Sequence, residues 1–169
     1  ETALSGGAPR WRTAEETPVA FIYNGRNYAV MMATPGNFAD FAVGFTLSER
    51  IASGIAEIAA IEIHCSEAGV DIRMELAPAA LARFDARQER RNLVGRAGCG
   101  VCGVDSSDVF FEKLPKVVAR GAAPVAEAIK KAVDALPGRQ PLNELTKSVH
   151  AAAWARADGA ILLAREDVG

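Results

Sequence analysis

The alternation of hydrophobic and polar residues predicts a chain that contains both strands and helices. Residues 17–34 hold two runs rich in β-branched and aromatic residues, separated by Asn24-Gly25. Both of these residues tolerate a positive φ angle, so the pattern predicts a β-hairpin. Two more β-rich runs, residues 58–65 and 69–77, are expected to form a second pair of strands.

Three other segments have the apolar spacing of amphipathic helices. The first lies within residues 34–51 and is expected to be capped by Asn37. The others cover residues 78–91 and 124–138, and each begins with a proline, which favours the first turn of a helix. The apolar positions of the first helix, which we interpret as core, are Phe38, Phe41, Ala42 and Phe45.

The last β-rich segment, residues 149–166, predicts a hairpin that turns at Ala157-Asp158-Gly159. Together these elements indicate an α+β fold. A sheet that begins with this hairpin needs cover on one face, and no helix follows it in the sequence. We therefore expect either a fragment of a longer domain or a disordered continuation.

Composition narrows the class of protein. The chain has 169 residues, a hydrophobic fraction of 50% and a net charge of -2, which is typical of a globular protein. Its 19 basic and 21 acidic residues are interspersed, so no basic patch for nucleic acid is expected. No apolar run reaches the roughly 18 residues of a membrane span. The first residues show no signal peptide, and they lack an initiator Met, which indicates a missing or processed N-terminus.

Two of the three cysteines, Cys99 and Cys102, lie in the glycine-rich stretch GRAGCGVCGVDSS, residues 95–107. Three cysteines cannot all pair within one chain, and so low a cysteine content favours a cytoplasmic protein. The Cys-x-x-Cys spacing lets two sulfur atoms meet one partner, whether a metal, another sulfur or a substrate. A structural zinc site, a dithiol–disulfide oxidoreductase, a mobile thiol arm and an incidental surface loop are the alternatives.

A structural zinc site needs two further ligands with a matching spacing, such as a second Cys-x-x-Cys. The other candidates are His64, Cys65 and His150, which lack that spacing, and the first two would point to opposite faces of a strand. An oxidoreductase of the thioredoxin type places its first cysteine at a helix N-terminus. Val101 and Val104, with the flanking glycines, disfavour a helix there.

The glycines of this stretch favour the mobile thiol arm. Gly98, Gly100 and Gly103 flank the two cysteines and give the backbone conformational freedom. A loop of this kind can carry a sulfur atom between two sites, which a rigid helix cannot. A pair of exposed cysteines is a reactivity liability that a passive loop has little reason to keep.

Four segments in the same order resemble the formate dehydrogenase accessory sulfurtransferase family (FdhD type). They are residues 14–51, 95–107, 140–155 and 165–169, so the resemblance runs from residue 14 to the last residue. It implies a sulfur carrier that accepts persulfide sulfur from a cysteine desulfurase. The sulfur would pass to the molybdenum cofactor, in its bis(molybdopterin guanine dinucleotide) form, before the cofactor enters formate dehydrogenase.

The resemblance also implies roles for the two thiols. Cys99 is expected to carry the persulfide and Cys102 to act as the second thiol, although spacing alone allows the two roles to be exchanged. No permanently bound cofactor is implied, because the molybdenum cofactor is the sulfur acceptor. The partners implied are the desulfurase, formate dehydrogenase and a second copy of the chain in a homodimer. Neither nucleic acid nor a membrane is expected as a partner.

The same family implies a cytidine deaminase-like α/β domain after an N-terminal mixed α/β domain. The predicted limits are a flexible arm at 1–15, an N-terminal domain at 16–94, the mobile loop at 95–107 and the truncated start of the deaminase-like domain at 108–169. No family residue for cofactor contact is carried over.

Three residues remain as candidates for cofactor binding: His150, Glu166 and Asp167. The two acidic residues end a strand, where open sheets often place ligand groups, yet they can equally be solvated. A lone histidine on a strand is more often a core or interface residue.

A non-catalytic chaperone that binds and protects the cofactor is the alternative function. A zinc enzyme of the deaminase type is disfavoured because its H-x-E and P-C-x-x-C ligand set is absent from the sequence.

Overall fold

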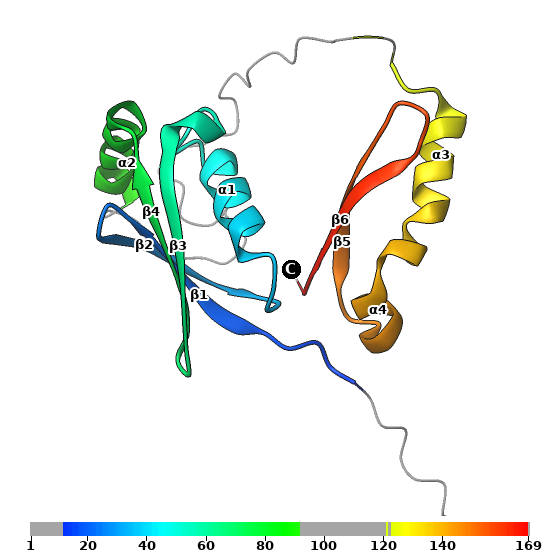
Figure 1. The fold of residues 1–169 in the computed structure, drawn as a ribbon, viewed down its shortest axis with the longest axis horizontal. Helices are drawn as coiled ribbons and strands as arrows, with labels where there is room; N and C mark the ends of the chain where they lie inside the picture. Colours follow the sequence, from blue (N-terminus) through cyan, green and yellow to red (C-terminus); the bar gives the residue numbers. More distant parts are fainter. Residues whose placement is uncertain (1–11, 92–120, 122, 169) are drawn as a thin grey trace, which may run out of the picture. The chain divides into compact units, whose positions relative to one another are not determined.

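The computed structural model describes residues 12–91, 121 and 123–168, which divide into two compact units (Figure 1). The sheet unit contains residues 18–31 and 37–91, and the hairpin unit contains the rest of the described chain. Both units combine helices with strands, which confirms the predicted α+β class. The predicted domain limits stay a prediction, and the loop at 95–107 lies outside the described residues.

The sheet unit is built on a four-stranded sheet with the strand order β2-β1-β4-β3. β1 runs parallel to β4, whereas β3 is antiparallel to β4. Within the described chain β3 therefore forms one edge of the sheet. The strands are β1 (Thr17–Tyr23), β2 (Arg26–Ala33), β3 (Ile58–Ser66) and β4 (Gly69–Leu76).

The predicted hairpin at Asn24-Gly25 is confirmed as the turn between β1 and β2. Both residues have positive φ angles, 47° and 74°, as a two-residue turn of this kind requires. The Asn24 side chain also holds the turn against β4. Its Oδ1 accepts a hydrogen bond from the Leu76 backbone N–H at 3.0 Å, and its Nδ2 donates to the Glu75 carboxylate at 2.8 Å.

Two helices, α1 (Phe38–Ser48) and α2 (Pro78–Arg91), pack on one face of this sheet. Phe21 and Tyr23 lie two residues apart on β1, so their side chains point to the same face. The Phe21 ring lies 4.1 Å from the ring of Phe45 in α1, and the Tyr23 ring lies 5.2 Å from that of Phe84 in α2. Both helices therefore pack on the same aromatic core.

A buried polar network joins this core to α1. The Thr46 hydroxyl donates to the Ala42 carbonyl oxygen at 2.7 Å, within the helix. The Tyr23 hydroxyl lies 2.8 Å from the same Thr46 oxygen, so it must donate to it. Both buried hydroxyls are thus satisfied, which removes the cost of burying them without a partner.

Asn37 precedes α1 as predicted, but it does not cap the helix with its side chain. Its backbone is left-handed, with φ 50° and ψ 31°, and its side chain makes no capping hydrogen bond. Side-chain capping normally uses an extended backbone at this position, which directs the side chain back to the first amides of the helix. The predicted helix is therefore right, and the predicted cap is wrong.

The hairpin unit combines a two-stranded sheet with short helices (Figure 1). The predicted hairpin is confirmed, with β5 paired antiparallel to β6. The sequence did not predict the six-residue α4, because such a short helix shows no apolar period. The elements are α3 (Ala126–Ala135), the 3₁₀ turn η3 (Pro137–Arg139), α4 (Pro141–Thr146), β5 (His150–Ala155) and β6 (Ile161–Asp167). A further 3₁₀ turn, η1 (Ile55–Glu57), precedes β3 in the sheet unit.

Much apolar surface of the hairpin unit is exposed among the described residues. Trp154 on β5 is 71% exposed, and Leu163, its partner across the strand pair, is 48% exposed. On α3, Ile129 and Val133 are also exposed, whereas Ala128 is buried. The predicted amphipathic helix is present, but its larger apolar side chains do not form a core within the described chain.

The turn of the β5–β6 hairpin contains two residues with specific local roles. The Asp158 carboxylate accepts a hydrogen bond from the Ala160 backbone N–H at 3.0 Å, and this bond chiefly holds its pKa below the ordinary value. Gly159 has a φ angle of 80°, and a Cβ atom added there would lie 2.3 Å from the Ala128 carbonyl oxygen. This glycine therefore allows the turn to approach α3 closely.

Replacing Gly159 with alanine is expected to lower the free energy of unfolding by about 2–4 kcal/mol, because the left-handed backbone and the overlap with Ala128 both oppose a Cβ atom. Gly138→Ala is the control, since Gly138 has no positive φ and nothing lies within 4 Å of its added Cβ. Urea unfolding of the two variants measures the difference. Equal stabilities would show that the turn does not approach α3 in this way.

No helix in the described part of the chain is both long enough and apolar enough to cross a membrane.

Candidate functional site

The two cysteines predicted to carry sulfur, Cys99 and Cys102, lie outside the described residues. The remaining candidates, His150, Glu166 and Asp167, all lie in the hairpin unit. Their surroundings show what each side chain does in the folded protein.

The Glu166 carboxylate caps the N-terminus of α4. Pro141 opens this helix and has no N–H group, so Leu142 and Asn143 provide the first free amides. The Leu142 N–H donates to Glu166 Oε2 at 3.0 Å, and the Asn143 N–H donates to Oε1 at 2.8 Å. A carboxylate at a helix N-terminus is stabilised both by these bonds and by the helix dipole.

Asp167 and its neighbour Val168 join the end of β6 to the segment that follows β2. The Thr34 backbone N–H donates to Asp167 Oδ1 at 2.6 Å, and the Val168 N–H donates to Thr34 Oγ1 at 3.1 Å. All three residues belong to the hairpin unit. The two bonds hold the residues after β2 against the last strand.

His150 lies directly opposite Asp167 in the strand pair, and its side chain is exposed. Side chains alternate along a strand, so His150 and Asp167 share one face while Glu166 lies on the other. The three candidates are therefore not brought together at one site. Among the described residues, no group of three or more His, Cys, Asp or Glu side chains is arranged to hold a metal ion.

Sequence reasoning missed the partners of both carboxylates. A signal for the first was present, because Pro141 begins a short polar segment and proline favours the first turn of a helix. No signal marked Thr34, since its contact depends on a fold that brings residues 133 positions apart together.

Replacing Glu166 with alanine is expected to lower the free energy of unfolding by about 1–3 kcal/mol, because two helix amides lose a charged acceptor. Glu144→Ala is the matched control. Glu144 is an exposed glutamate within α4, the helix that Glu166 caps. Thermal and urea unfolding measure the effect. A Glu166→Ala protein as stable as the parent protein would contradict this capping role.

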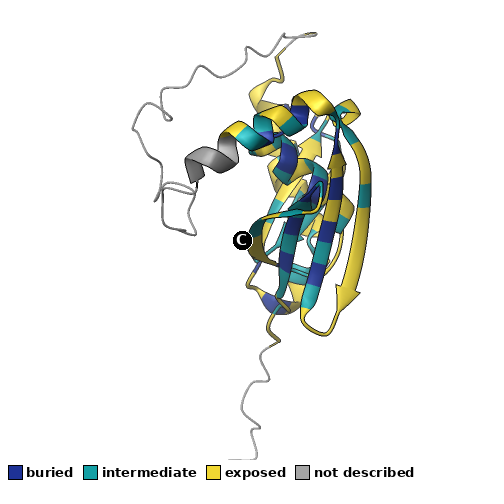
Figure 2. Cartoon of the chain, turned by 90° about the vertical axis from the view of Figure 1, so that its left-hand side faces the viewer, coloured by how far each residue is buried: buried dark blue, intermediate teal, exposed yellow. Residues whose placement is uncertain are grey.

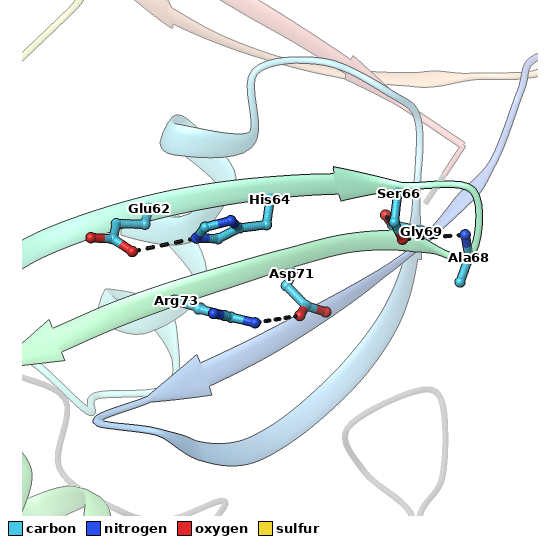
Figure 3. A network of polar contacts seen from close by, with 7 residues as sticks. All are labelled: Glu62, His64, Ser66, Ala68, Gly69, Asp71 and Arg73. Atoms are coloured by element: carbon cyan, nitrogen blue, oxygen red, sulfur yellow. Dashed lines mark hydrogen bonds and ion pairs between the residues drawn. The ribbon is translucent and has the colours of Figure 1, made fainter.

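The sheet face opposite α1 and α2 has no helix of the described sheet unit over it, and we call it the uncovered face. It carries a second polar cluster (Figure 3). On β3, His64 Nε2 lies 3.3 Å from Glu62 Oε2, within hydrogen-bond distance, and on β4 Asp71 and Arg73 form an ion pair at 3.3 Å. In the strand pairing Glu62 lies opposite Arg73, and His64 lies opposite Asp71. Each charged group thus has an oppositely charged or chargeable neighbour both along its strand and across it.

This charged cluster borders an open hollow of about 510 Å³ on the sheet. Its lining includes the carboxylates of Glu62, Asp71 and Glu75 and the guanidinium of Arg73. Cys65 follows His64 on β3 and is an exposed free cysteine. As predicted, it points to the face opposite His64, because Cys65 is paired with Val70 and His64 with Asp71.

Comparisons with known proteins identify the relatives of this chain. Residues 14–169 match the FdhD/NarQ family. The sulfur carrier protein FdhD of Xanthomonas euvesicatoria pv. vesicatoria is 46% identical over 156 residues, which cover 92% of this chain and 54% of that protein. The sulfur carrier protein FdhD of Cupriavidus necator is also 46% identical, over 92% of this chain and 53% of its own length. The chain spans about half the length of these curated relatives.

A solved structure has a similar fold. It is a protein from Desulfotalea psychrophila described as a formate dehydrogenase accessory protein. The two chains superpose with a TM-score of 0.63 at 23% identity, over 93% of this chain and 55% of the other. This likeness concerns the fold alone. The family match spans nearly the whole sequence and the two relatives share 46% of the aligned residues, so the chain belongs to the FdhD/NarQ family.

Proposed function

We propose that this protein is a sulfur carrier that receives persulfide sulfur from a cysteine desulfurase and delivers it to the molybdenum cofactor of formate dehydrogenase. The observation that carries the proposal is the Cys-x-x-Cys sequence at Cys99 and Cys102, inside a family match that covers residues 14–169. Relatives that are 46% identical bear the name sulfur carrier protein. The proposal includes action in the cytoplasm, as a homodimer.

In the first step the Cys99 thiolate attacks the terminal sulfur of the desulfurase persulfide. The sulfur–sulfur bond of that persulfide breaks, and a new one forms at Cys99. The desulfurase cysteine leaves as a thiolate, so the step moves one sulfur atom without net oxidation or reduction. A thiolate is the nucleophile this exchange requires, and thiols are the groups that the glycine-rich stretch supplies.

In the second step Cys102 attacks the sulfur atom of Cys99. A disulfide forms between the two cysteines, and the terminal sulfur leaves. It takes the proton of the Cys102 thiol and departs as hydrosulfide, which the molybdenum cofactor captures. The two thiols are oxidised while the transferred sulfur is reduced to the sulfide level. An external thiol reductant then restores both cysteines for another cycle.

Cys65, the third cysteine, has a different setting. It lies near the end of β3, a strand paired with β4 over most of its length. A thiol on a paired strand has little freedom to travel between a donor and an acceptor. The proposal therefore assigns sulfur transfer to Cys99 and Cys102 alone.

Incubation with a cysteine desulfurase and cysteine tests this function. Mass spectrometry of the peptide that spans residues 95–107 should show one added sulfur atom, and treatment with a thiol reductant should remove it. The peptide that contains Cys65 is the internal control and should stay unmodified.

A second outcome would favour a different function. If the peptide stays unmodified while the protein binds the molybdenum cofactor, the protein is a chaperone that protects the cofactor and carries no sulfur. If sulfur adds to Cys65 as readily as to the 95–107 peptide, the reaction is unspecific and the assignment is wrong.

A further inference from the structure

The edge strand β3 is open along its length among the described residues. It has nine residues and lies at the end of the sheet order, so one side of its backbone has no partner strand there. Figure 2 shows this strand largely in the colour of exposed residues, whereas in its neighbour β4 every second residue is buried. Ile63 is 40% exposed, although Ile72, directly opposite it on β4, is fully buried.

Natural proteins usually protect such edges against pairing. They use short strands, prolines, lysines, bulges or charged side chains that point inward. From Ala60 to Ser66, β3 contains no proline and no lysine, and its pairing to β4 is regular. The only irregularity within this pairing lies at its start, between Ile58 and Ala60. Glu62 and His64 point to the uncovered face, so they do not block the edge.

The sequence of this edge is complementary to itself. If two copies of β3 pair antiparallel with Ile63 opposite Ile63, Glu62 of each copy lies opposite His64 of the other. This arrangement continues the alternation of acidic and basic groups that β3 and β4 already show within one copy (Figure 3). Opposite-charge pairs across strands stabilise a sheet, and like-charge pairs destabilise it.

The neighbouring registers lack this complementarity. Centring the pair on Glu62 would place the two Glu62 carboxylates opposite each other, and centring it on His64 would oppose the two imidazoles. The register centred on Ile63 also brings together the two isoleucine side chains that each copy leaves partly exposed. Charge and apolar burial therefore favour the same register.

We propose that β3 is an interface between two copies of this chain, which join their sheets edge to edge with Ile63 on the two-fold axis. Residues 60–66 of the copies then exchange backbone hydrogen bonds, and the two Glu62–His64 pairs fix the register. This inference rests on the homodimer of the proposed function and names its contact surface, whereas loading of sulfur on the peptide at residues 95–107 is measured separately and does not depend on it.

Mixing two charge variants of the protein tests the register. In Glu62→Lys alone, the introduced lysine faces His64 of the second copy, and in His64→Glu alone, the introduced glutamate faces Glu62 of the second copy. Each variant is expected to dimerise about tenfold or more weakly than the parent protein. When the two variants are mixed, every cross-copy pair is complementary again, so a heterodimer should form. Analytical ultracentrifugation measures the association, and the recovery on mixing shows that both variants are folded.

Glu75→Lys is the matched control, because it makes the same change of charge on the same face but on β4, one strand away from the edge. It should dimerise as the parent protein does. Amide hydrogen exchange of residues 60–66 should slow as the protein concentration rises.

Several results would overturn the proposal. One is a parent protein that stays monomeric, and another is single variants that dimerise as strongly as the parent. A third is a mixture that associates no better than its parts. Slow exchange at residues 60–66 that does not depend on concentration would show that another segment of the same chain covers the edge.

Discussion

Replacing Cys99 with serine is expected to reduce the activation of formate dehydrogenase by roughly two orders of magnitude or more. Serine keeps the size of the side chain but provides no thiolate, so no persulfide can form. Loss of a covalent nucleophile commonly has an effect of this size. The measurement is formate dehydrogenase activity in cells that lack their own sulfur carrier and produce the variant.

Two further substitutions separate the roles of the cysteines. Cys65→Ser should leave activation unchanged, because Cys65 lies on a paired strand and is not assigned to transfer. Cys102→Ser should still accept sulfur at Cys99 but release it slowly, so the persulfide accumulates. If Cys102→Ser blocks loading while Cys99→Ser accepts sulfur, the two roles are exchanged. Full activation by both variants would contradict sulfur transfer through this pair.

Replacing Phe21 with alanine is expected to lower the free energy of unfolding of the sheet unit by about 3–5 kcal/mol. Phe21 is fully buried, and its ring contacts Phe41 at 5.0 Å and Phe45 at 4.1 Å. Alanine would leave a cavity between β1 and α1 and remove both ring contacts. Chemical unfolding, followed by circular dichroism, measures the loss.

Ile22→Ala is the control for that substitution. Ile22 is the next residue along β1, and it lines the hollow on the uncovered face of the sheet. Its truncation should cost clearly less free energy of unfolding, because no helix among the described residues of the sheet unit packs on that face. Comparable losses for Phe21→Ala and Ile22→Ala would contradict the packing of α1 and α2 on a single face.

The elements with a strong local signal could be predicted from the sequence. Asn24-Gly25 marked a turn because both residues adopt positive φ angles, and the structure has both there. The helix at 78–91 follows from a proline in its first turn and an apolar period, and α2 has those limits. Ala157-Asp158-Gly159 between two apolar runs marked the closing hairpin, and Gly159 has a positive φ angle there.

The candidate site depended on contacts that no local pattern contains. The carboxylates of Glu166 and Asp167 were possible cofactor ligands in the sequence, whereas in the structure they bind backbone amides of α4 and Thr34. These partners are distant along the chain, so only the fold reveals them. Asn37 shows the same limit on a smaller scale, because residue type predicted a cap and the backbone angle prevented it.

The sulfur assignment has a different basis. It comes from the spacing of Cys99 and Cys102 and from the family match, and both residues lie outside the described part of the chain. In the described part of the chain, Glu166 and Asp167 accept hydrogen bonds from backbone amides, and Cys65 lies on a paired strand. The two thiols in residues 95–107 are therefore the groups on which the account depends.

The most direct test follows an isotopic sulfur label from cysteine, through the desulfurase, to this protein and on to the molybdenum cofactor. The label is expected to appear first as one sulfur atom on Cys99. It should then leave that residue when the cofactor is added and appear on the cofactor. A label that reaches the cofactor at the same rate in the presence of the Cys99→Ser, Cys102→Ser double variant would contradict the account.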